Sequence, residues 1–167
     1  MNVKLQKMNC ENVMKTVKVY DEAYEYRKRS GGNCLTKNDS TEALQVLVKW
    51  LDEGDVYNII GHGELIGYIY IEYLSIEQAV LKDIYIIEKY HGKRICKNAM
   101  RELDEALKRL GIQYLTADIV PKNKYVLKFY QDCGFEQVEF IQLKRNIMEE
   151  IKNDDVVYID GCQFQRS

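Results

Sequence analysis

A basic turn between an apolar strand-like run and an amphipathic helical pattern is the segment best suited to chemistry. The apolar run of residues 81–86 leads into His91-Gly92-Lys93-Arg94-Ile95-Cys96-Lys97. The start of a helix leaves backbone N–H groups unpaired at the positive end of its dipole, and the lysines and arginine add charge there. These groups predict a phosphate or pyrophosphate site. An ordinary helix start on a solvated surface is the alternative interpretation.

Other common kinds of site find no support. Gly61-x-Gly63 precedes a strand-like run and lacks a third glycine in register, which excludes a dinucleotide-binding turn, and there is no P-loop. His62 and His91 have no second imidazole or thiol at ligand spacing, so we expect no metal site. Cys96 follows His91 by five residues on one expected helix and therefore on a different face, which disfavours a Cys–His nucleophilic pair.

Two motifs resemble those of the GCN5-related N-acetyltransferases. The strand and turn of residues 81–96 are similar to the acetyl-CoA signature of that family, a strand followed by [QR]-x-x-G-x-[GA]. Further on, Asn123, Tyr130 and Gly134-Phe135 are similar to the family pattern N-x(6)-Y-x(3)-G-F, in which Asn and Tyr contact the cofactor and Gly-Phe closes a helix. The resemblance extends over residues 3 to about 145. It implies an acyl-CoA N-acyltransferase fold and direct transfer of an acetyl group from acetyl-CoA to a primary amine in a ternary complex.

Three positions depart from the first motif. His91 stands where Gln or Arg is usual, Arg94 replaces the first motif glycine, and Cys96 replaces the final Gly or Ala. The arginine could crowd the cofactor, or its side chain could swing outward and neutralise a phosphate. The cysteine fits a small buried hydrophobe better than a reactive thiol. A non-catalytic member of the fold that binds acyl-CoA or a protein partner is therefore the alternative function.

The resemblance also assigns roles in the transfer. A protonated amine must lose a proton, usually through ordered water to a carboxylate. Asp118 is the first candidate, since it lies where the ribosomal-protein-alanine acetyltransferase branch carries its catalytic Glu; Asp83 is the second and Glu72 the third. Tyr130 is the expected proton donor to the leaving thiolate. A core aromatic of a short helix is its alternative role.

The same resemblance places the contacts with acetyl-CoA. The family's cofactor strand bulges where a backbone N–H stabilises the thioester oxygen, and the break in alternation between Leu81 and Ile84 is consistent with a bulge. The pantetheine and acetyl contacts are then expected at Ile84, Tyr85 and Ile86. The remaining cofactor contacts are expected at His91, Gly92, Lys93, Arg94, Ile95, Cys96, Lys97, Asn123 and Tyr130.

The amine acceptor is expected to lie against the first two helices and the late strands. The first helix carries acidic and aromatic residues that suit a cationic amine, namely Tyr20, Glu22, Tyr24, Glu25 and Tyr26. A solvated helix face above a core stripe has the same pattern. The sequence does not choose between a peptide N-terminus, a lysine, a polyamine and an aminoglycoside.

Hydrophobic periodicity gives the elements that would position these residues. Strands are expected at residues 3–8, 56–60, 65–73, 79–87, 114–120, 137–143 and 156–159. Helices are expected from Val13 up to a break at Ser30-Gly31-Gly32-Asn33, between Asp39 and Gly54, from His91 to Leu110, and from Asn123 to Cys133. The order predicts an α+β fold, with a mostly antiparallel central sheet of about seven strands and helices on both faces, as a single domain of residues 1–167.

Composition narrows the class of protein. The chain has 167 residues, is 46% apolar and 30% charged, and carries a net charge of −2, which is typical of a globular domain and not of a polyanion-binding protein. We therefore expect no nucleic-acid or membrane partner. Five scattered cysteines suggest reduced thiols and a cytoplasmic location. A monomer or a homodimer is expected, and the apolar residues 156–159 could form an edge of the latter.

Overall fold

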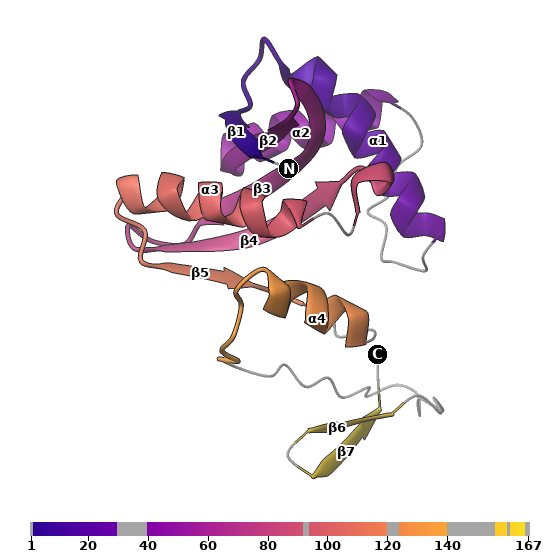
Figure 1. Ribbon diagram of the computed structural model, residues 1–167, viewed down its shortest axis with the longest axis vertical. Coiled ribbons are helices and arrows are strands. Elements are labelled where there is room, and N and C mark those ends of the chain that lie inside the picture. Colours follow the sequence, from indigo (N-terminus) through magenta and orange to yellow (C-terminus); the bar gives the residue numbers. More distant parts are fainter. Residues whose placement is uncertain are drawn as a thin grey trace. The chain divides into compact units, whose positions relative to one another are not determined.

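The computed structural model describes residues 2–29, 40–91, 94–119, 124–139, 156–159 and 161–165. The chain forms two compact units, residues 1–119 and 120–167. Figure 1 follows the chain from its N-terminal helices and sheet to its C-terminal hairpin.

The first unit is built on a five-stranded sheet in the order β1-β2-β3-β4-β5. Its strands are Val3–Lys7 (β1), Gly54–Gly61 (β2), Glu64–Tyr73 (β3), Gln78–Ile86 (β4) and Tyr114–Ala117 (β5). Neighbours are antiparallel from β1 to β4, whereas β5 runs parallel to β4. The α+β class and the mostly antiparallel sheet are thereby confirmed.

Helices pack on the sheet of the first unit. They are α1 (Val13–Arg29), α2 (Ser40–Glu53) and α3 (Ile95–Arg109), with a 3-10 turn η1 (Glu88–Tyr90) before α3. Helices α1 and α2 cover the face that carries the rings of Tyr68, Tyr70 and Tyr85, which lie in one core cluster with Tyr20 and Trp50. Figure 1 shows α3 on the other side of the sheet. Its apolar stripe is buried at Ile95, Ala99, Met100, Leu103 and Leu107.

The second unit contains α4 (Lys124–Asp132) and an antiparallel hairpin of β6 (Val156–Ile159) and β7 (Cys162–Gln165). The expected strand at residues 156–159 is confirmed, and β7 was not expected. The expectation of a strand over residues 137–143 is wrong for residues 137–139, which form no strand, and residues 140–143 lie outside the described part. Among the described residues the central sheet has five strands in place of the expected seven or so, and β6 and β7 form a separate two-stranded sheet.

Two boundaries near the expected site also differ from the sequence prediction. Helix α3 begins at Ile95, because η1 and the turn at His91 occupy the preceding residues. The expectation that His91 and Cys96 share one helix is therefore wrong. Strand β5 ends at Ala117, so Asp118 follows the strand. Helix α1 ends at Arg29, as the expected break at Ser30 predicts, and its last turn carries three basic residues, which the negative end of the helix dipole stabilises.

Candidate active site

A bulge divides β4 into two halves. Its register with β3 moves from Ile71 opposite Leu81 to Tyr70 opposite Asp83, so Lys82 is the extra residue. The bulge expected between Leu81 and Ile84 is confirmed. Strand β5 pairs with β4 only over Gln78–Leu81. From Lys82 to Ile86 the same edge of β4 has no partner strand within the described residues.

The hydrogen-bond alternation of an antiparallel strand shows which backbone groups face this open edge. The N–H of Ile87 donates to the carbonyl of Ile66 in β3, at 2.9 Å. Alternate residues direct their N–H and C=O groups to the same neighbour, so Tyr85 also faces β3, while Ile84 and Ile86 face away from it. Two of the three expected pantetheine-contact residues thus present backbone groups to the open edge. The side chain of Tyr85 is buried in the α1–α2 core.

His91 is anchored to the end of this strand. Its Nε2 lies 2.6 Å from the carbonyl oxygen of Ile86, so Nε2 carries the proton and donates. Its ring meets that of Tyr26 edge-on, with centroids 5.3 Å apart. These contacts join the beginning of the basic turn to β4 and α1. Gly92 and Lys93 lie outside the described residues.

Arg94 occupies the N-cap position of α3 in the left-handed conformation, with φ of 56°. Its carbonyl accepts the N–H of Asn98 at 3.2 Å, and its side chain makes no capping hydrogen bond. Ile95, Cys96 and Lys97 form the first turn, whose N–H groups precede the helical hydrogen-bond ladder. Ile95 is only 1% exposed, so its backbone alone can meet a ligand. Lys97 is exposed at the same helix end.

Asp83 lies in a largely buried ion pair. Arg27 of α1 donates to both carboxylate oxygens, with Nη1 3.0 Å from Oδ2 and Nη2 bonded to Oδ1. The hydroxyl of Tyr68 donates to Oδ2 at 3.1 Å. Burial lowers the pKa of Arg27, but the electrostatic effects of Tyr68 and Asp83 outweigh it and raise this pKa overall. The second candidate base therefore already has a cation and a phenol on its two oxygens.

The other candidate carboxylates differ in their surroundings. Glu72 accepts a hydrogen bond from Tyr70 at 2.7 Å and lies 3.6 Å from the ammonium group of Lys82. Asp118 is exposed and immediately follows Ala117, which pairs with Leu81 next to the bulge. Within the described part of the chain, no ion pair or side-chain hydrogen bond engages Asp118. The first-choice base is thus the one beside the point where β4 and β5 part.

Tyr130 belongs to the second unit, near the end of α4. Its half-buried ring meets Phe129 and Phe135 edge-on, at centroid distances of 5.3 and 5.6 Å. The N–H of Phe135 donates to the Tyr130 carbonyl at 3.1 Å, and Gly134 adopts φ of 100°. This is the glycine-closed helix end that the second motif predicts. The catalytic role of Tyr130 stays a prediction, and Asn123 lies outside the described residues.

The expected acceptor residues of α1 separate into core and surface groups. Tyr20 is 3% exposed and packs against Trp50, so it belongs to the core stripe. Glu22 accepts hydrogen bonds from the Tyr85 hydroxyl at 3.1 Å and from the Glu88 N–H at 3.4 Å, and Glu25 is exposed. The core stripe of the alternative interpretation is therefore present, and an acceptor-binding role for the surface residues stays a prediction.

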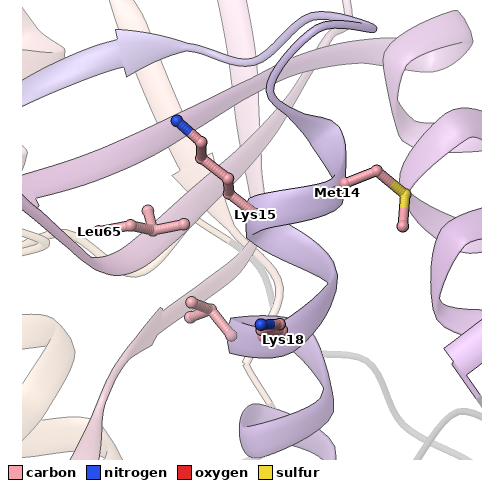
Figure 2. Close-up of a pocket in the computed structure, with 5 residues that line it drawn as sticks. Met14, Lys15, Lys18 and Leu65 are labelled. Carbon is pink, nitrogen blue, oxygen red and sulfur yellow. The ribbon is translucent and has the colours of Figure 1, made fainter.

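An open hollow of about 570 Å³ lies toward the start of α1, lined by Met14, Lys15, Lys18, Val19 and Leu65. Figure 2 shows Met14 and Lys15 leaving α1 in opposite directions, with Leu65 of β3 opposite the lysine. None of the expected catalytic or cofactor-binding residues lines it. The hollow is therefore separate from the β4 edge.

The family model described as Acetyltransferase (GNAT) family matches residues 17–135. The chain belongs to the GNAT family. This range includes the bulge, the basic turn, α3 and the glycine-closed end of α4. The protein is accordingly an acetyl-CoA-dependent N-acetyltransferase whose amine acceptor is unidentified.

Similar proteins span most of the chain. "Uncharacterized N-acetyltransferase YycN" of Bacillus subtilis (strain 168) is 22% identical over 156 residues, covering 87% of this chain and 99% of that protein. The solved structure of AAC(6')-Iy in complex with a bisubstrate analog has a TM-score of 0.66 at 15% identity, covering 87% of this chain and 99% of the other. Ribosomal-protein-alanine N-acetyltransferase from Brucella melitensis biovar Abortus 2308 has a TM-score of 0.63 at 13% identity, with coverage of 87% and 100%. The likeness to these structures shows the GNAT fold.

Sequence reasoning missed Arg27 and Tyr68 as partners of Asp83. A signal was available, because Arg27 follows Tyr20 by seven residues and continues the buried stripe of α1. A charged residue on a core-facing stripe requires a buried partner. Which carboxylate would supply it depends on the β4 register, which only the structure reveals.

The described residues hold no group of three or more His, Cys, Asp or Glu side chains that could bind a metal ion. Among them, no helix is long and apolar enough to cross a membrane.

Proposed function

We propose that acetyl-CoA binds along the open edge of β4, with its pyrophosphate at the start of α3. The observation that carries this proposal is the end of the β4–β5 pairing at the Lys82 bulge. The pantetheine arm carries amide groups, which can bond to a free strand edge as an added strand does. The N–H and C=O of Ile84 and the N–H of Ile86 supply that edge, since the Ile86 carbonyl accepts the hydrogen bond from His91.

The start of α3 suits the pyrophosphate. Its first N–H groups lie at the positive end of a fifteen-residue helix, and Arg94 and Lys97 are exposed beside them. His91, fixed by its bond to Ile86, would hold the turn against β4. The cofactor contacts that we propose here are His91, Gly92, Lys93, Arg94, Ile95, Cys96, Lys97, Asn123 and Tyr130.

The residues of the chain then have separate roles in the transfer. Acetyl-CoA supplies the acetyl thioester. The backbone N–H of Ile84 would donate to the thioester oxygen as negative charge grows there. Asp118 would remove the amine proton through water, because Asp83 and Glu72 are engaged by Arg27, Tyr68, Lys82 and Tyr70. Tyr130 would return a proton to the departing thiolate.

The acceptor is a primary amine of a small molecule or of a peptide or protein. Support comes from the similar structures of AAC(6')-Iy and of a ribosomal-protein-alanine N-acetyltransferase, which represent a small-molecule and a protein acceptor. In addition, the carboxylates of Glu22 and Glu25 in α1 would attract a cationic amine. We also propose a cytoplasmic location, which the five scattered cysteines of the sequence, none of them in Cys-x-x-Cys spacing, support.

Calorimetry with acetyl-CoA and a thiol-release assay test this function. We expect saturable binding of acetyl-CoA, and turnover with at least one member of a panel containing an alanine-terminated peptide, a lysine peptide, a polyamine and an aminoglycoside. Absence of binding at high micromolar acetyl-CoA would refute the proposed site. Binding without turnover across the panel would instead favour the non-catalytic alternative.

A further inference from the structure

Two ion pairs hold the bulge of β4. Lys82, the extra residue, lies 3.6 Å from Glu72 of β3, and Asp83 is bonded through both carboxylate oxygens to Arg27 of α1. The α1 pair is the more buried, since the side chains of Arg27 and Asp83 are 27% and 14% exposed, against 40% for Lys82. Two parallel hydrogen bonds from a planar guanidinium fix direction as well as distance. The Asp83 side chain is thus held in one orientation.

That orientation bears on the open edge because Asp83 directly precedes Ile84. Rotation of the Asp83 backbone would turn the peptide that carries the Ile84 N–H. A bulge residue lacks the regular ladder that fixes its neighbours, so its direction depends on side-chain contacts. Tyr68 adds a third contact, with its hydroxyl 3.1 Å from Oδ2 of Asp83 and 3.5 Å from Nη2 of Arg27. Its ring is fully buried, which makes this anchor rigid.

We propose that Arg27 is a positioning residue for acetyl transfer: by holding Asp83, it directs the Ile84 N–H toward the thioester oxygen. The inference rests on the proposed role of the β4 edge. It gives Asp83 a different task from that of a base, since its carboxylate orients the backbone while it stays bound to the guanidinium. The raised pKa of Arg27 agrees with a permanently charged partner.

A purely structural role is the competing explanation, and the chain contains a matched control. Asp55 of β2 is also buried, accepts hydrogen bonds from Tyr73 at 2.7 Å and Tyr57 at 3.3 Å, and pairs with Lys7 at 2.7 Å. This second cluster joins β1, β2 and β3 and contains no residue of β4. Loss of Asp55 should therefore lower stability without affecting the edge.

The experiment compares Arg27→Met, the double variant Arg27→Met with Asp83→Leu, and Asp55→Leu. Arg27→Met leaves a buried carboxylate unpaired, so its melting temperature should fall, and removal of both charges should restore much of it. We expect kcat to fall about 10- to 100-fold in both Arg27 variants, since a small misplacement of a reacting group costs about that much. Acetyl-CoA affinity should change less than kcat. Asp55→Leu should lower the melting temperature and keep kcat.

Arg27→Lys adds a graded test, because a single ammonium group keeps the charge and loses the paired geometry, so kcat should lie between wild type and Arg27→Met. The inference is overturned if kcat follows melting temperature across the set, recovering in the double variant or falling equally in Asp55→Leu. Failure of the proposed function would look different, since the unmodified enzyme would then bind no acetyl-CoA.

Discussion

Arg94 has two opposed effects: its backbone conformation is strained, and its positive charge lies beside the start of α3. It holds φ of 56° at the N-cap of α3, a conformation that costs most side chains about 1 kcal/mol or more and that glycine adopts freely. The motif glycine therefore has a conformational reason at this position, besides any close approach to phosphate. In this chain the strain accompanies an exposed guanidinium beside the helix start.

Arg94→Gly should separate the two effects. Relief of the left-handed strain, less the greater freedom of glycine in the unfolded chain, should raise stability by about 0.5 kcal/mol, or about 1–2 °C in melting temperature. Acetyl-CoA should bind more weakly and with less dependence on salt, because a charge near the phosphates is lost. Differential scanning calorimetry and titration calorimetry at two salt concentrations measure both.

Arg94→Ala is the control, since it removes the charge and retains the strain. Its melting temperature should not rise, whereas its acetyl-CoA affinity should match that of the glycine variant. Tighter binding by the glycine variant would instead show that Arg94 crowds the cofactor.

Tyr130→Phe tests the proton donor. Phenylalanine retains the ring that packs against Phe129 and Phe135, so these contacts should persist in the variant. We expect kcat to fall about 100-fold, as for loss of a general acid, with acetyl-CoA affinity nearly unchanged. Tyr158→Phe, which removes an exposed phenol of the same unit, should leave kcat intact in the same assay. An unchanged kcat in Tyr130→Phe would remove this residue from the chemistry.

At the scale of elements, the sequence correctly predicted those helices and strands that hydrophobic periodicity determines. The strand from residue 79 to the bulge, the long helix ending before Gly111, and the glycine-closed α4 are all present because their apolar spacing and left-handed glycines are local signals. The break in alternation in β4 was visible because a bulge shifts the side-chain period by one residue.

Features that depend on tertiary contacts were not predicted. The helical pattern cannot show that His91 leaves the helix to donate to Ile86, because that bond requires the folded strand end. The pairing of Arg27 with Asp83 spans 56 residues and depends on the β4 register. Strand β7 is a different case, because it pairs with the adjacent β6, and the Asp160-Gly161 pair followed by the alternating residues 162–165 is a local hairpin signal that sequence reasoning missed. A long-range partner decides only the Arg27–Asp83 pair.

Gly67→Ala tests whether displacement of strand β4 weakens acetyl-CoA binding. A Cβ at Gly67 would lie 2.3 Å from the carbonyl oxygen of Tyr85 and 3.1 Å from the Cα of Ile86, so β4 must shift. Stability should fall by about 1–3 kcal/mol. The dissociation constant of acetyl-CoA should rise about tenfold, equivalent to about 1.4 kcal/mol of binding free energy, because the displaced residues form the proposed edge. Denaturant unfolding and titration calorimetry give the two quantities.

Gly54→Ala is the matched variant. Its Cβ would lie 2.0 Å from the carbonyl oxygen of Ile71, also a backbone clash, but between β2 and β3. It should lose comparable stability and bind acetyl-CoA within about twofold of wild type, well under 1.4 kcal/mol. Equal weakening in both variants would mean that affinity follows stability and would count against the β4 edge as the site.

At the scale of the whole first unit, phenols join the sheet to its helices. Among the described side chains, six tyrosines have a pKa raised chiefly by desolvation, namely Tyr20, Tyr57, Tyr68, Tyr70, Tyr73 and Tyr85. Nearby carboxylates raise it further, as Asp83 does for Tyr68 and Glu22 for Tyr85. The folded unit therefore favours the protonated phenols across β2, β3, β4 and α1.

This arrangement predicts a steep loss of stability in alkali. A group whose pKa is higher in the folded than in the unfolded protein contributes its full stabilisation below its unfolded pKa, about 10 for tyrosine, and loses it as pH rises toward the folded pKa. Unfolding free energy should therefore be level up to about pH 9.5 and fall above it. Absorbance of tyrosinate should rise in two phases, first from the phenols without a raised pKa and then from these six together with loss of circular dichroism. Tyr68→Phe should make the decline above pH 10 shallower, and a single smooth titration with the fold intact would contradict the raised pKa of these phenols.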